Sequence, residues 1–80
     1  MKHHDAEALL GRLLRQVAPE VELDGLDRGA LLQDEADLDS MDFLNIVTAL
    51  SEETGIEVPE RDYPELATVT GFVDYIVAAS

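Results

Sequence analysis

Apolar residues recur at helical spacing in three stretches of the chain, with polar and glycine-containing segments between them. The first stretch runs from Asp5 to Val17 and should end before Pro19, because proline cannot continue a helix. The second is predicted from Ser40 to about Thr54, and Gly55 stands where helices commonly stop. The third is predicted to follow Thr68, whose side chain can cap a helix N-terminus. The positions expected to face the core are Leu9, Leu10, Leu13, Leu14 and Val17, then Phe43, Ile46, Val47 and Leu50, and finally Val69, Phe72, Val73, Ile76 and Val77.

A long connection, from Ala18 to Leu38, separates the first two helices. Such a length fits a compact domain only if the connection is packed onto the core. Its leucines are expected to hold it against the core, and two glycine-containing pairs are expected to form turns. These residues are Leu23, Leu26, Leu31 and Leu32, and the turns are Asp24-Gly25 and Arg28-Gly29.

The segment after the second helix should contain one more short element. Ile56 and Val58 are expected to return to the core, and Pro59 to Tyr63 can form one helical turn that Pro64 interrupts. No stretch shows the alternation of a strand. The sequence therefore predicts an all-α bundle of three longer helices and one short one, forming a single domain over residues 1–80 with its core between about residues 5 and 79.

Charge narrows the possible partners. Eighteen acidic and five basic side chains give a net charge of -13, which opposes binding to nucleic acid or to anionic membranes. All five basic residues lie outside the segment 29–60, which holds nine carboxylates. Proteins with basic patches are the expected partners. Without cysteine, a signal-peptide pattern or a stretch long enough to span a membrane, the chain is predicted to be cytoplasmic.

One hydroxyl lies among carboxylates where the second helix begins. Asp39 is predicted as the N-cap and Asp42 as a favourable charge in the first turn, which places Ser40 at the first helical position. A nucleophilic serine needs a neighbouring base, and the only histidines, His3 and His4, lie in an N-terminus expected to fray. Ser40 is therefore expected to be modified by another enzyme, unless it is only an ordinary helix-start serine.

A phosphate at this helix start would have to be covalently attached. The free N–H groups of a helix N-terminus attract phosphate. Here Glu35, Asp37, Asp39 and Asp42 crowd the same point with negative charge, so a free anion would be repelled.

A second group of candidate residues, for docking to partners, lies on or beside the face of the second helix that is turned away from its core stripe. At about 100° per residue this side includes two apolar residues that the core does not need. Single exposed apolar residues are common, but two on one face beside Ser40 favour a docking patch. The residues are Met41, Leu44, Asn45, Thr48 and Glu52.

No metal site is predicted. Asp37 and Asp39 alternate as in a calcium-binding loop, but that loop then needs a third oxygen ligand and a glycine. Met41 and Asp42 occupy those two places.

The motif Asp39-Ser40-Met41 at the start of an amphipathic helix resembles that of the acyl carrier protein family. Further matches are Ile56-Glu57-Val58-Pro59 and Val73-Asp74-Tyr75-Ile76, and the resemblance covers residues 5–79. It implies an up-and-down bundle with a long first loop. It also implies that Ser40 receives 4′-phosphopantetheine from coenzyme A, that acyl intermediates are held on this arm as thioesters, and that the chain itself catalyses nothing.

The resemblance also implies partners. Asp39 and Asp42 would meet basic residues of a phosphopantetheinyl transferase, and Met41 and Leu44 would contact acyl-loading, condensing or acyl-transfer enzymes, with the carrier acting as a monomer. Asn45 departs from the acidic residue common at this place in fatty-acid carriers, so fatty-acid, polyketide and dedicated side pathways all stay open. Two alternatives are an acidic helical adaptor that binds without a covalent arm, and an aminoacyl or peptidyl carrier.

Overall fold

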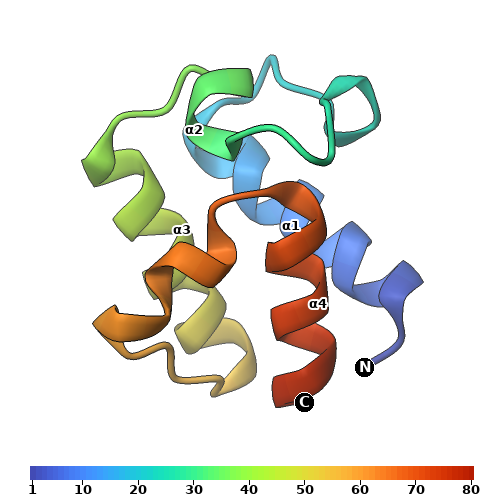
Figure 1. The fold of residues 1–80 in the computed structure, drawn as a ribbon, viewed down its shortest axis with the longest axis vertical. Helices are drawn as coiled ribbons and strands as arrows, with labels where there is room; N and C mark the ends of the chain where they lie inside the picture. Colours follow the sequence, from blue (N-terminus) through green and yellow to red (C-terminus); the bar gives the residue numbers. More distant parts are fainter.

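The computed structural model, which describes residues 1–80, has the predicted all-α architecture. It has no strand, only an isolated bridge between Leu31 and Thr68. Figure 1 shows α1 passing behind α4 toward the short α2 at the top of the bundle, with α3 on the left. None of these helices has both the length and the apolar character needed to cross a membrane. In chain order the elements are α1 (His3–Val17), the 3-10 helix η1 (Leu23–Gly25), α2 (Leu32–Glu35), α3 (Ser40–Thr54), the 3-10 helix η2 (Glu60–Leu66) and α4 (Val69–Ala79).

The core lies where α1 packs along both α3 and α4. It contains 19 buried apolar residues. All the positions predicted for the core faces are buried except Val17 and Val77, which are partly buried and pack against the core from its edge. The predicted stripe of α3 is fully confirmed, because Phe43, Ile46, Val47 and Leu50 are all buried.

The predicted helix ends are also confirmed, except that α1 begins two residues before Asp5. Gly55 follows α3 with a φ of 75°, a left-handed conformation that glycine adopts without a steric penalty. The Thr68 hydroxyl accepts a hydrogen bond of 3.0 Å from the Gly71 N–H and so caps α4.

The first connection is held to the core by three of the four predicted leucines and by further buried residues. Leu32 is buried as expected, but Leu31 is 53% exposed and that prediction is wrong. Leu31 has an extended backbone that forms the bridge to Thr68, so its side chain and that of Leu32 point in opposite directions. Ala18, Ala36 and Leu38 are the additional buried residues, while Leu23 and Leu26 pack at the edge of the core.

The second prediction to be corrected concerns Pro64, which does not interrupt the short helix. η2 continues through it to Leu66, which is fully buried. Proline fixes φ near -65°, a value that a 3-10 helix already uses, so the ring removes one donor without changing the path of the chain. Ile56 is buried and Val58 is half-buried, as expected.

Two features fix η2 to α4. The Tyr75 hydroxyl donates to Asp62 Oδ2 over 2.8 Å, which raises the pKa of Tyr75, as do burial and the nearby negative charge. In addition, α4 approaches the end of η2 so closely at Gly71 that a Cβ there would lie 2.4 Å from the Glu65 carbonyl oxygen.

The two ends of the chain meet. The N-terminal amino group donates to the Ser80 hydroxyl, and His3 Nε2 lies 3.0 Å from Asp74 Oδ1 on α4. The expectation of a frayed N-terminus is therefore wrong, because α4 provides partners for the first residues. Figure 1 shows both ends on the opposite side of the bundle from the start of α3.

Candidate functional site

Ser40 is the first residue of α3 and is exposed. The turn that carries it is closed by a reciprocal capping box between the residues around it. The Asp42 N–H donates to Asp39 Oδ1 over 2.8 Å, and the Asp39 N–H donates to Asp42 Oδ2 over 3.4 Å. Both carboxylates thus accept hydrogen bonds from backbone N–H groups, and the Ser40 hydroxyl is left without a partner at the helix start.

The chain is anchored on both sides of Ser40. Upstream, Asp37 has a φ of 54° at the end of α2, and the Leu38 N–H reaches back to the Gln33 carbonyl oxygen over 2.8 Å. This is the backbone arrangement of a Schellman motif, and it turns Leu38 into the core. Downstream, Phe43 is buried. Ser40 is therefore held on a short exposed segment between two core residues.

The other two serines already have partners. The Ser51 hydroxyl donates to the Ile56 carbonyl oxygen over 2.7 Å at the C-terminal end of α3. The Ser80 hydroxyl donates to the Val77 carbonyl oxygen over 3.1 Å and accepts from the N-terminal amino group. Ser40 is the serine whose hydroxyl is available.

Negative charge surrounds this helix start without a basic counterpart. The three ion pairs of the protein, Arg12–Glu53, Arg28–Glu7 and His3–Asp74, involve none of the acidic residues of the segment 34–42. Glu35 Oε1 accepts from the Asp27 N–H over 2.8 Å, which ties this carboxylate to the first connection. The site therefore attracts cationic groups and repels free anions.

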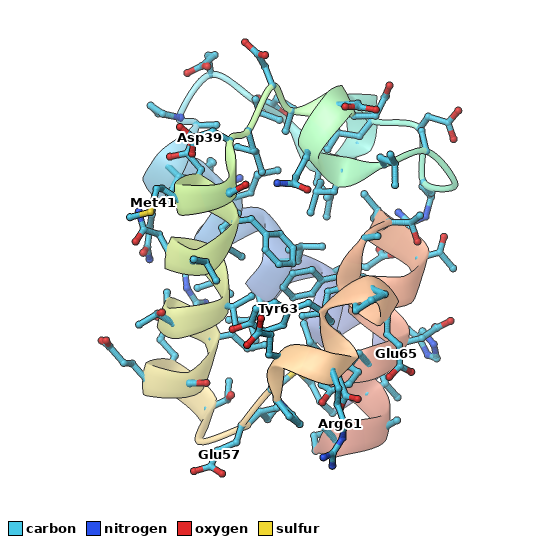
Figure 2. The ribbon with its side chains drawn as sticks, turned by 60° about the vertical axis from the view of Figure 1, so that its left-hand side comes forward. Asp39, Met41, Glu57, Arg61, Tyr63 and Glu65 are labelled. Carbon is cyan, nitrogen blue, oxygen red and sulfur yellow. The ribbon has the colours of Figure 1, made fainter.

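The predicted docking residues lie on α3 or in the segment just before it, and nearly all of them are exposed. Figure 2 shows Asp39 and Met41 on the outer side of this helix. Met41 is 65% exposed and Leu44 is 38% exposed, so the core does not require either of them. Asp42 is half-buried, and the remaining predicted residues are exposed: Glu35, Asp37, Asp39, Asn45, Thr48 and Glu52.

Beside Ser40 lies a groove that the sequence did not predict. It has a volume of about 440 Å³ and is open to solvent. Ser40 and Leu44 contribute to it from α3, and Tyr63 contributes from η2. The full lining is Gln33, Ser40, Phe43, Leu44, Glu60, Tyr63, Pro64 and Ala67. These residues come from three separated segments, so no local pattern marks them.

Two other open cavities lie along α1, and Ser40 lines neither of them. One, of about 330 Å³, contains His4, and the other, of about 470 Å³, lies against the end of α3. His3 pairs with Asp74 and His4 lines the first of these cavities, so neither histidine lies in the groove beside Ser40. The site thus offers a free hydroxyl, a neighbouring groove and a negative surface, but no histidine that could act as a base for Ser40.

Comparison with known proteins gives a consistent set of matches. Residues 8–76 match a family model described as "Phosphopantetheine attachment site". The acyl carrier proteins of Tropheryma whipplei strains Twist and TW08/27 are each 40% identical to this chain over 60 residues, covering 69% of it and 73% of their own length. The solved structure of the acyl carrier protein from Enterococcus faecalis matches with a TM-score of 0.72 and 27% identity, over 94% of this chain and 98% of that one.

Proposed function

We propose that Ser40 is the residue that carries the 4′-phosphopantetheine arm. The proposal starts from the family: this chain belongs to the phosphopantetheine-attachment family and is an acyl carrier protein. One observation carries the assignment. Of the three serines, only Ser40 combines a free, exposed hydroxyl with a position on the edge of a groove.

The residues around Ser40 suit a covalent phosphodiester better than a bound phosphate. Ser40 Oγ would form the bond to phosphorus, its proton would pass to the transferase, and the nucleotide portion of coenzyme A would leave. The capping carboxylates Asp39 and Asp42 would repel a free phosphate, whereas a covalent bond holds the group in place. The arm, when attached, supplies a terminal thiol that holds an acyl group as a thioester. The protein is a carrier and not an enzyme.

Acyl carrier proteins interact with a phosphopantetheinyl transferase and with acyl-handling enzymes. For this chain, the proposed docking surface combines the acidic residues before and within the first turn of α3 with Met41 and Leu44. Its matching partner surface would be a basic patch around an apolar contact. The same charge opposes nucleic acid and anionic membranes as partners. A monomeric state and a cytoplasmic location remain predictions.

The assignment is tested by intact mass after incubation with coenzyme A and a transferase of broad specificity. The wild-type protein should gain one arm, Ser40→Ala should gain none, and the control Ser80→Ala should gain one. Folding should survive in Ser40→Ala, since losing an exposed helix-start hydroxyl costs about 1 kcal/mol or less. A circular dichroism spectrum checks this. An arm added to the Ser40→Ala protein would show that the attachment residue is a different one.

A further inference from the structure

Side chains fill the space between α3 and η2. α1 packs along α3 and α4, and η2 packs on α4, but the backbones of α3 and η2 do not pack closely on each other. Phe43 from α3 and Tyr63 from η2 meet across this space, with ring centroids 5.8 Å apart and an angle of 76° between the rings. Figure 2 shows Tyr63 pointing inward between the two elements.

This aromatic pair separates the groove beside Ser40 from the interior. Both rings line the groove, and Phe43 also belongs to the core, with 9% of its surface exposed. The core itself is close-packed, and its members Leu50, Leu66 and Phe72 have no exposed surface. All three cavities of the protein are open at the surface. An acyl chain that passed the pair would therefore have to displace packed side chains.

Tyr63 is also held firmly in place. The element that carries it is attached to α4 by the Tyr75–Asp62 hydrogen bond of 2.8 Å and by the close backbone approach at Gly71. Leu66, at the end of the same element, is fully buried. Moving Tyr63 aside by swinging η2 outward would disrupt all three contacts.

We propose that Tyr63, packed on Phe43, determines cargo specificity by keeping the acyl chain in the surface groove and out of the core. This inference rests on the proposed attachment at Ser40. It assigns short acyl groups as the cargo that the protein shields, because the groove has a limited apolar surface, with four of its eight lining residues apolar. The distal part of a longer chain would remain in solvent.

The experiment measures how fast hydroxylamine cleaves the thioester on the loaded protein. The transferase attaches butyryl, hexanoyl, octanoyl or decanoyl arms directly from the corresponding coenzyme A thioesters, and intact mass follows the loss of the acyl group. Free acyl-pantetheines of the same lengths provide the reference rates. The variants are Tyr63→Ala, which removes the ring, and Tyr63→Phe, which keeps it. A melting curve of each loaded form gives a second measure of cargo burial.

For the wild type and Tyr63→Phe, cleavage should change by less than about twofold from hexanoyl to decanoyl, and the melting temperature should stay level, because no further methylene is buried. In Tyr63→Ala, each additional methylene that enters the core should slow cleavage by up to about fourfold and raise the melting temperature.

Progressive protection of the longer chains in the wild type, equal to that in Tyr63→Ala, would overturn the inference. If Tyr63→Ala does not fold, the wild-type series alone still decides the question. A failure of the assignment to Ser40 is distinct, because Ser40→Ala would then still accept an arm.

Discussion

Gly71 is the one glycine at which an added Cβ would collide with the backbone of another element. A Cβ there would lie 2.4 Å from the Glu65 carbonyl oxygen and 3.1 Å from the Thr68 hydroxyl. Contacts of a Cβ below 3.0 Å are essentially never seen, so the two backbones must separate by at least 0.6 Å. The atom in the way belongs to the backbone at the end of η2, and it cannot rotate aside as a side chain could.

Two opposing effects set the size of the change in Gly71→Ala. Overpacking costs about 1–3 kcal/mol, and a rigid backbone neighbour places this site toward the upper end. Alanine returns about 1 kcal/mol because glycine is unfavourable inside a helix. The expected net loss is about 1–2 kcal/mol, a large fraction of the roughly 3–5 kcal/mol that a domain of this size derives from its core.

Urea unfolding followed by circular dichroism measures this loss. With a slope of about 1 kcal/mol per molar urea, the midpoint should fall by about 1–2 M. Gly25→Ala is the matched control, because nothing lies within 4 Å of its added Cβ and the midpoint should stay nearly unchanged. A Gly71→Ala protein as stable as the wild type, or more stable, would refute the reasoning and show that α4 and η2 separate freely.

Four further predictions concern the α3 surface, the backbone, the charge and Tyr75. Phe43→Ala should cost about 3–5 kcal/mol, whereas Met41→Ala should leave the melting curve almost unchanged and slow the transferase instead; the opposite pattern would place the docking surface elsewhere. Asp37→Gly should stabilise the protein by about 1 kcal/mol and so raise the urea midpoint, because Asp37 has a φ of 54°, in the left-handed region that favours glycine. A lower midpoint would contradict this. The melting temperature should rise with salt, since charges more than about 8 Å apart are largely screened at physiological ionic strength; no change would mean that the crowded carboxylates do not affect stability. The pKa of Tyr75 is raised in the folded protein, so its contribution to stability is present below the ordinary value of 10.0 and is lost as the pH rises through the folded value. In that pH range the stability of Tyr75→Phe should therefore fall less steeply than that of the wild type. Urea unfolding at a series of pH values measures this.

The features that the sequence predicts well are those governed by neighbouring residues. The limits of α3 follow from a capping aspartate at one end and Gly55 at the other, and its buried face follows from the helical period. The exposure of Met41 and Leu44 follows from the same period. Each of these predictions needs only residues within a few turns of one helix.

The features that the sequence does not predict depend on contacts between distant segments. Leu31 and Leu32 are adjacent and chemically identical, and long-range backbone contacts of this segment, the bridge to Thr68 and the Leu32 N–H bond to the Ala67 carbonyl oxygen, orient them differently. Likewise, the groove requires α2, α3 and η2 to meet, so Tyr63 has no local feature that connects it with Ser40. The reciprocal cap was half predicted, because Asp39 was expected to accept from the helix but Asp42 was not expected to return the bond.

The meeting of the two chain ends has a practical consequence for handling this protein. The N-terminal amino group contacts Ser80, on the far side of the bundle from the start of α3 (Figure 1). An immobilising tag or a fused neighbouring domain at either end would therefore point away from Ser40. The same proximity means that a short linker could join the ends, allowing a circular permutant to be opened elsewhere on the surface. Tethered arrays of the carrier could in this way keep every Ser40 facing outward.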